Sequence, residues 1–331
     1  MDFQENWFDE MDIPELRHYV RRPSFLTVNA YYWAMTVIFA LLQAGLPVLY
    51  WMLSAVWDIS YTGYTTAAQI LLYLGAMLMP IALYTLSHPA EREAFRLRST
   101  SAKRVVCAVV AAGLGYFAAN FLTVLWMVLL EGFGLHNTAA DAFTGSLPLD
   151  LLMISVLPAV CEELLFRGMV MGAYERWGTW RAIFISAALF AGLHGSVAGL
   201  PVHFLLGVAL GYVAASTGSL LPGMALHGVY NAIAVVVAYN SPADVALDIS
   251  MTEQIGGAMG IGICAVMFLV CAALFLAALG CMDRMRLRAD EPFGNDAVIE
   301  HKKLGRAELV LLVSGVVTVV WFYLQDLLIM I

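Results

Sequence analysis

The chain has 331 residues, of which 61% are hydrophobic and only 13% are charged, and its net charge is −8. Soluble domains contain about 25% charged residues, so this chain has too few charges to cover the surface of a soluble domain. The composition excludes an ordinary soluble enzyme, a disordered protein and a nucleic-acid-binding protein with a basic face, and it points to a membrane protein.

Long runs without Asp, Glu, Lys or Arg mark the candidate membrane spans, because a spanning helix needs about 20 mainly apolar residues. The sequence predicts an all-α polytopic membrane bundle of nine transmembrane helices, with eight as the lower bound. We expect the spans near residues 30–56, 67–87, 105–130, 151–174, 182–195, 202–216, 222–240, 256–281 and 309–329.

The basic residues predict how the bundle is oriented. All 17 Lys and Arg residues fall on one side of the nine-span arrangement, whereas the loops on the other side carry acids and no base. Cytoplasmic loops are enriched in Lys and Arg, so this pattern predicts a cytoplasmic N-terminus and a C-terminus outside. A single basic face on an acidic protein favours the plasma membrane of a bacterium.

The span at 151–174 carries two adjacent carboxylates, Glu162 and Glu163, and one arginine, Arg167. Charged residues inside a span are costly, so they mark a candidate functional site. Glu163 and Arg167 are four residues apart and can form an ion pair on one helix face. The simpler interpretation of such a pair is a purely structural role. Such a pair accounts for only one carboxylate, and the other is a candidate general base.

Histidines in the following charge-free block extend this polar set. Phe190 and His194 share one helix face, as do His227 and Asn231. A carboxylate and a histidine can orient and deprotonate a water, while a histidine and an asparagine can donate to the oxyanion of a tetrahedral intermediate. His203 stands at the start of its span, and we expect it to be interfacial or structural.

Glu and His are also zinc ligands, which makes Glu162, His194 and His227 candidate metal ligands. The HExxH spacing of zinc proteases is absent, and so is the GxSxG motif of serine hydrolases. The residues alone therefore leave the cofactor open between zinc and none.

Three motifs in this order resemble those of the CPBP family, also called the Abi family. That family comprises type II CAAX prenyl endopeptidases and bacteriocin-processing or immunity proteins. Its pattern EExxxR, FxxxH and HxxxN corresponds here to residues 162–167, 190–194 and 227–231. The resemblance covers roughly residues 147–239, and no motif position departs from the pattern.

The resemblance implies an intramembrane endopeptidase that hydrolyses a peptide bond in a membrane-associated peptide or protein. By resemblance, Glu162 and His194 would activate the attacking water, and His227 and Asn231 would form the oxyanion site. The family has been called metalloproteases, but the same residues also fit a metal-free mechanism that depends on glutamate.

The remaining motif residues receive supporting roles by the same resemblance. Glu163 and Arg167 would shape the site through their ion pair, with Phe190 beside them. A non-catalytic immunity or binding protein of the same fold is the alternative function. A proton-coupled transporter is a weaker one, because the paired broken helices of many transporters are not evident.

The expected organisation has four parts. Residues 1–25 form an acidic cytoplasmic leader, 26–145 accessory membrane helices, 146–245 the catalytic core, and 246–331 C-terminal helices with a cytoplasmic linker at 283–306. The leader is compatible with an interfacial helix or with a solvated tail. The expected partners are a peptide or membrane-protein substrate and the lipid bilayer, with no nucleic acid, and the oligomeric state is left open.

Overall fold

The computed structural model describes residues 21–136, 143–240, 250–289, 291–294 and 303–331. The regular elements within these ranges are helices, and none is a strand. This confirms the predicted all-α membrane bundle. Most of the predicted acidic leader lies in residues 1–20, outside the described part of the chain.

Seven helical stretches of the described residues are long and apolar enough to cross a membrane. They are α1 (Phe25–Ser54), the stretch α2–η1–α3 (Tyr61–Ser87), α4 (Ala102–Glu131), α9 (Leu200–Thr217), α10 (Leu221–Asn240), α12 (Gly257–Arg288) and α13 (Arg306–Met330). Each coincides with one of the predicted spans.

The two other predicted spans are helical as well, but they differ from these seven. Residues 147–174, called here the 147–174 helix, join α5 (Leu147–Asp150), η3 (Leu151–Val156), α6 (Leu157–Glu163), η4 (Leu164–Val170) and α7 (Met171–Tyr174). α8 (Thr179–His194) has 16 residues, which is short for a span. The count of nine spans and their orientation stay predictions.

Two helix ends differ from the expected positions. α1 begins at Phe25 rather than near residue 30, because the Ser24 side chain caps the helix by accepting the Thr27 N–H. α12 continues through Arg288 into the segment predicted as a linker. Its last turns carry arginines, which are favourable near the negative end of a helix dipole.

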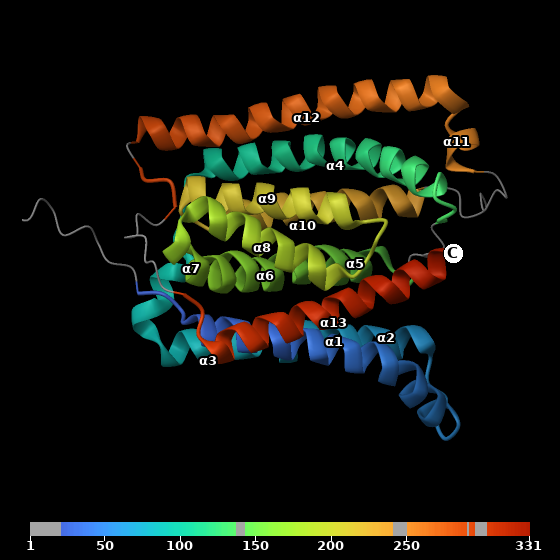
Figure 1. The fold of residues 1–331 in the computed structure, drawn as a ribbon, viewed down its shortest axis with the longest axis horizontal. Helices are drawn as coiled ribbons and strands as arrows, with labels where there is room; N and C mark the ends of the chain where they lie inside the picture. Colours follow the sequence, from blue (N-terminus) through green and yellow to red (C-terminus); the bar gives the residue numbers. More distant parts are fainter. Residues whose placement is uncertain (1–20, 137–142, 241–249, 290, 295–302) are drawn as a thin grey trace, which may run out of the picture.

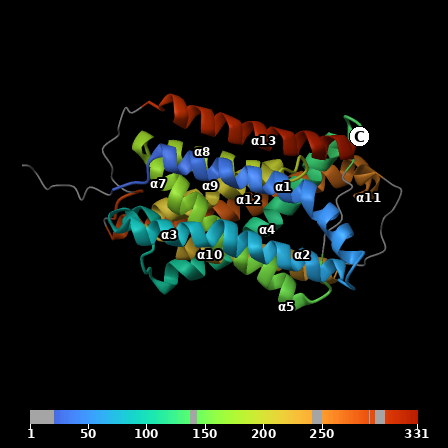
Figure 2. The ribbon, with the colours of Figure 1, turned by 90° about the horizontal axis from the view of Figure 1, so that it is seen from below.

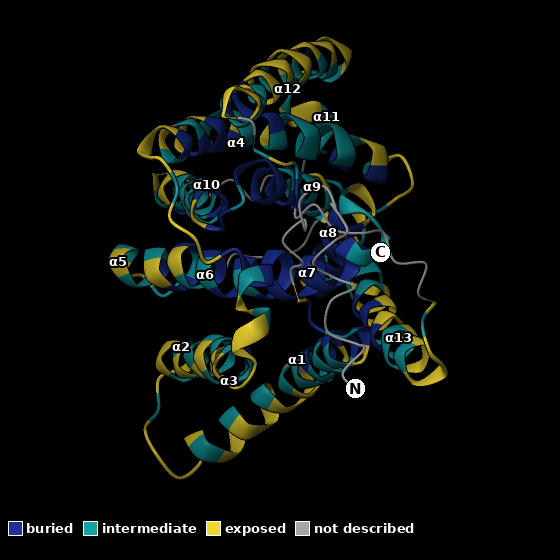
Figure 3. Ribbon diagram, turned by 90° about the vertical axis from the view of Figure 1, so that its left-hand side faces the viewer, coloured by how far each residue is buried: buried dark blue, intermediate teal, exposed yellow. Residues whose placement is uncertain are grey.

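The helices form three layers (Figure 1). α12 and α4 lie on one side, and α1, α2, α3 and α13 lie on the other. α8, α9, α10 and the 147–174 helix occupy the middle. Figure 2 shows α13 and the α2–α3 stretch on either side of α1. Figure 3 shows that buried residues concentrate on α6 to α9, so the accessory helices enclose the polar motifs.

Glycines allow α8 and α9 to approach closely. A Cβ at position 207 would lie 2.9 Å from the Cα of Ala187, and one at position 211 would lie 3.1 Å from Ile183 Cγ2. Gly207 and Gly211 form a GxxxG pair, the small-residue pattern that lets membrane helices pack backbone to backbone. This contact fixes the distance between the two helices that carry His194 and His203.

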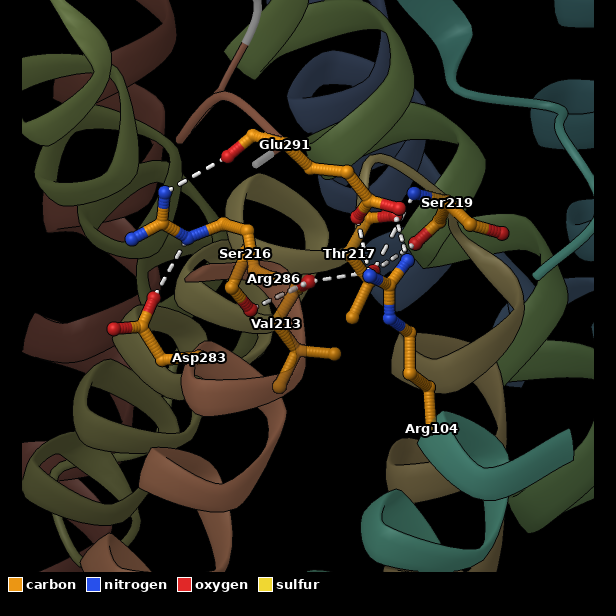
Figure 4. A network of polar contacts seen from close by, with 8 residues as sticks. All are labelled: Arg104, Val213, Ser216, Thr217, Ser219, Asp283, Arg286 and Glu291. Atoms are coloured by element: carbon orange, nitrogen blue, oxygen red, sulfur yellow. Dashed lines mark hydrogen bonds and ion pairs between the residues drawn. The ribbon is translucent and has the colours of Figure 1, made fainter. Parts of the chain in front are cut away.

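A polar network joins the ends of α4, α9 and α12 (Figure 4). Arg104 pairs with Glu291 and donates to the Thr217 carbonyl at 3.4 Å. Arg286 pairs with Asp283 at 2.8 Å and donates to the Glu291 carbonyl at 3.0 Å. The segment after α12 is thereby attached to the middle layer.

The close α8–α9 contact predicts that Gly207→Ala lowers the free energy of unfolding by about 1–3 kcal/mol, because the methyl group overpacks against Ala187. Gly262→Ala is the matched control, since a Cβ at position 262 on α12 meets no atom within 4 Å. We expect it to be neutral or stabilising by up to about 1 kcal/mol. Unfolding in detergent micelles measures both variants, and equal stabilities would contradict the packing account.

Candidate active site

Glu163 and Arg167 form a fully buried ion pair in the middle layer, as their spacing predicts. Arg167 Nη1 lies 2.9 Å from Glu163 Oε1, and both side chains are 0% exposed. Arg167 also donates from Nη2 to the Gly207 carbonyl at 3.0 Å, and its guanidinium carbon lies 4.5 Å from the centre of the Phe190 ring. The pair therefore joins the 147–174 helix to both α8 and α9.

The helix around this pair is irregular. Residues Leu164–Val170, which include Arg167, are π-helical and follow directly on Glu163. Single π-helical turns are rare and occur frequently at functional sites. Here the π-helical residues lie between the Glu162–Glu163 pair and the end of the helix that we predict to be cytoplasmic.

His227 lies between the two carboxylates. Its Nδ1 lies 3.1 Å from Glu163 Oε1, which accepts the proton, and its Nε2 lies 3.9 Å from Glu162 Oε2. The second separation is too long for a direct hydrogen bond. His227 is thus held by Glu163 through one nitrogen and presents the other nitrogen toward Glu162.

Glu162 differs from its neighbour in having no ion pair with arginine. The side chain is only 10% exposed, and its Oε2 is buried without a hydrogen-bond partner among the described protein groups. A buried carboxylate oxygen without a partner is unusual in a stable fold. This oxygen is therefore available to accept a proton from a small molecule at the site.

His194 is the last residue of α8 and contacts aromatic rings. Its Nδ1 donates to the Phe190 carbonyl at 2.9 Å, which leaves Nε2 as the nitrogen that accepts. The Phe190 ring lies 4.7 Å from the His194 ring and 5.8 Å from the His227 ring, centre to centre. Within the described structure, no hydrogen bond or ion pair joins His194 to Glu162.

Asn231 has a backbone partner that its motif does not reveal. Its side-chain amide donates to the Ile154 carbonyl at 3.0 Å. Pro158 has no N–H, so the Ile154 carbonyl, four residues earlier, lacks its usual α-helical donor. Asn231 supplies that donor and fixes α10 against the 147–174 helix, and its amide keeps a second N–H for other contacts.

The candidate metal ligands do not form a metal site in this conformation. Across the ranges that the structure describes, no three His, Cys, Asp or Glu side chains are grouped closely enough to hold a metal ion. Glu162 and His227 approach each other, but His194 turns its ring toward Phe190 and His203. Three-residue coordination by Glu162, His194 and His227 does not fit this arrangement, and no step proposed below passes through a metal.

Sequence reasoning undervalued two residues near His194. His203, which we expected to be interfacial or structural, stacks on the His194 ring, with the ring centres 4.0 Å apart. Asp326 on α13 accepts the backbone N–H of Val197, in the loop after His194, at 2.6 Å. From the sequence, Asp326 is the only other acid inside a predicted span, and a position at the membrane interface was its expected alternative.

A separate apolar cavity of about 500 Å³ lies between α4, α9, α10 and α12. Its wall includes Leu122, Leu206 and Phe275. Tyr230, within the 227–231 motif, also lines it, but none of the Glu, Arg, His or Asn side chains of the motifs does. α9 separates this cavity from the ion pair, because Leu206 faces the cavity while the next residue accepts the hydrogen bond from Arg167. The polar cluster, and not this apolar cavity, is therefore the candidate active site.

The buried pair predicts that Arg167→Met lowers the free energy of unfolding by about 3–5 kcal/mol, because it leaves Glu163 charged and unpaired. The double variant Glu163→Gln with Arg167→Met should recover part of this loss. Arg98→Ala is the matched control, since it breaks the more exposed Arg98–Glu93 pair and should cost less than about 1 kcal/mol. Unfolding in detergent micelles measures the stability of each variant. A wild-type stability for Arg167→Met would contradict the stabilising role of the buried ion pair.

Comparison with known proteins identifies the segment that holds this site. Residues 144–233 match the family model of type II CAAX prenyl endopeptidase Rce1-like proteins. No curated protein and no solved structure matches the chain. The matched segment contains every motif residue, from Glu162 to Asn231, and it supports a membrane-embedded protease with a peptide or protein substrate. The part of the chain that holds the candidate active site is therefore similar to the Rce1-like type II CAAX prenyl endopeptidases.

Proposed function

We propose that the chain is an intramembrane endopeptidase in which Glu162 is the general base. The observation that carries the proposal is the buried, unpartnered Oε2 of Glu162, which lies 3.9 Å from His227 Nε2. The neighbouring carboxylate of Glu163 is already engaged by Arg167. Glu163 also has a buried oxygen without a partner, its Oε2, but its Oε1 is engaged by both Arg167 and His227. We therefore assign the structural role to Glu163 and proton transfer to Glu162.

The charges of the cluster favour one shared proton. Glu162 and Glu163 carry two negative charges, and Arg167 supplies one positive charge. A net negative charge is costly in an apolar surrounding, so one more proton on His227 balances the cluster. Because His227 Nδ1 already donates to Glu163, that proton resides on Nε2 and faces Glu162.

Hydrolysis then follows from the positions of these groups. Glu162 accepts a proton from a water molecule, and the water oxygen bonds to the carbonyl carbon of the scissile peptide. The oxyanion accepts hydrogen bonds from His227 Nε2–H and from the second N–H of Asn231. When the carbon–nitrogen bond breaks, the proton on Glu162 passes to the leaving amine, and the products are a carboxylic acid, which keeps the second water proton, and an amine.

His194 is proposed to assist by orienting the water. Its Nδ1 is engaged by the Phe190 carbonyl, so Nε2 carries the lone pair that can accept a water proton. Since His194 makes no direct contact with Glu162, the two side chains would act on the same water from different sides.

The substrate we propose is the C-terminal tail of a membrane-associated protein or peptide, as the name of the matched family indicates. We place the N-terminus of the enzyme in the cytoplasm of a bacterial cell, from the one-sided distribution of Lys and Arg. A lipid-anchored tail would hold the scissile bond near the bilayer, where the buried cluster lies.

The proposal predicts that Glu162→Gln lowers kcat by about 10²- to 10⁴-fold, because the amide cannot accept the proton. The assay uses the protein in lipid nanodiscs with two internally quenched CAAX peptides, one farnesylated and one not. Glu93→Gln, at a solvent-facing ion pair, is the matched control and should keep the wild-type rate. Full cleavage by Glu162→Gln would overturn the mechanism, and binding without cleavage by the wild type would favour an immunity or binding protein.

A glutamate-activated water needs no metal, so cleavage should persist when the protein is treated with 1,10-phenanthroline and then freed of the chelator–metal complex. Elemental analysis of the same sample reports the metal content. Loss of cleavage that zinc restores would contradict the glutamate mechanism and would make Glu162 a metal ligand.

A further inference from the structure

His203 lies against the proposed site without belonging to any of the three motifs. Its ring stacks on that of His194, with centres 4.0 Å apart and planes inclined by 26°. It therefore reaches the polar cluster from α9, while the motif histidines reach it from α8 and α10.

The chain leaves space for this ring at one glycine. A Cβ at position 199 would lie 2.4 Å from Cε1 and 2.8 Å from Nδ1 of His203. The backbone of Gly199 has φ −86°, which any residue adopts, so the glycine is required here by contact and not by conformation. A side chain at this position would displace the imidazole from His194.

The loop beneath the ring is fixed by two other helices. The Val197 N–H donates to Asp326 of α13 at 2.6 Å, and the Val197 carbonyl accepts from the indole of Trp126 on α4 at 2.9 Å. Gly195 ends α8 with φ +59°, and a Cβ there would lie 2.8 Å from Phe322 Cβ. The accessory helices thus hold the loop that sets the position of His203.

Packing, rather than a hydrogen bond of its own side chain, holds the His203 ring. Its Nδ1 is buried without a hydrogen-bond partner among the described groups. His194, in contrast, ends its helix and has one side-chain hydrogen bond, to Phe190. The helix backbone is less constrained at its end than in its middle, so it holds His194 less firmly. The contacts with the neighbouring rings therefore restrict the rotation of the His194 side chain.

We infer that His203 is a positioning residue, which fixes the His194 ring by stacking on it above Gly199. The inference rests on the proposed function, in which His194 orients the attacking water. Phe190 supports the His194 ring and His203 stacks on it, so loss of His203 lets the ring leave its orientation while the bonds of Glu162 and His227 stay unchanged.

The first test compares His203→Ala with His203→Phe in the nanodisc cleavage assay. A misplaced catalytic group costs about 10- to 100-fold in rate, so we expect His203→Ala to lower kcat by that factor with KM within about twofold. His203→Phe retains an aromatic ring and should recover kcat to within about threefold of the wild type. A wild-type kcat for His203→Ala, or a kcat for His203→Phe as low as that of His203→Ala, would overturn the inference.

A second variant displaces the His203 ring but leaves residue 203 a histidine. Gly199→Ala should reproduce the kcat loss of His203→Ala, and it should add nothing further in the His203→Ala background because both act on one contact. Gly113→Ala is the matched control, since a Cβ at position 113 on α4 meets no atom within 4 Å. If Gly199→Ala behaves like Gly113→Ala, or if the two losses multiply, the inference is wrong.

A readout that does not depend on cleavage separates this inference from the proposed function. Carbethoxylation of His194 by diethylpyrocarbonate, followed by mass spectrometry, measures how accessible its ring is. We expect His194 to react several-fold faster in His203→Ala than in the wild type or in His203→Phe. Equal rates in all three proteins would refute the stacking role even if cleavage depends on Glu162. Faster labelling without any wild-type cleavage would uphold the stacking and reject the protease.

Discussion

A carboxylate and a guanidinium that are buried in a membrane protein need each other, because neither is tolerated alone in an apolar surrounding. Glu163 and Arg167 meet this need, and their remaining contacts reach three other helices. Arg167 binds the Gly207 carbonyl of α9 and lies over Phe190 of α8, while Glu163 accepts from His227 of α10. One ion pair therefore sets the relative positions of the middle-layer helices. It accounts for one of the two adjacent glutamates, and the other is the one that we propose as the general base.

Prolines that interrupt the helical hydrogen bonds are a second constraint on how the helices pack. A membrane provides no water to satisfy free backbone groups, so a carbonyl that a proline leaves without its α-helical donor is satisfied by a neighbouring helix, a side chain or a local change of helix geometry. Asn231 serves the Ile154 carbonyl, which Pro158 leaves without its α-helical donor. Tyr31 on α1 likewise donates to the Ala76 carbonyl at 2.8 Å, four residues before Pro80. The Asn231 bond joins two helices within the matched segment, and the Tyr31 bond joins two helices outside it.

The sequence predicted the helical class, the positions of the spans and the Glu163–Arg167 pair, because hydrophobic runs and i,i+4 spacing are local signals. It did not predict that His203 stacks on His194 or that Asp326 holds the intervening loop, because both contacts depend on how separate helices pack. The sequence predicted that His227 and Asn231 lie on one helix face, but it did not predict the hydrogen bond from Asn231 to the Ile154 carbonyl. That bond depends on Pro158 in another span and appears only once the two helices lie side by side. The sequence also did not predict that α12 continues to Arg288, into the segment assigned to the cytoplasmic linker.

The central claim is that Glu162 transfers a proton and that water, not the enzyme, attacks the peptide. It is tested most directly by a single turnover in ¹⁸O-labelled water, with the enzyme in excess over the farnesylated peptide. Mass spectrometry of the released fragment then shows where the new carboxyl oxygen came from. Direct attack by water predicts one ¹⁸O atom in the new carboxyl group from the first turnover. An unlabelled carboxyl group in the first turnover would show that a carboxylate oxygen of the enzyme attacked instead, and would contradict the account.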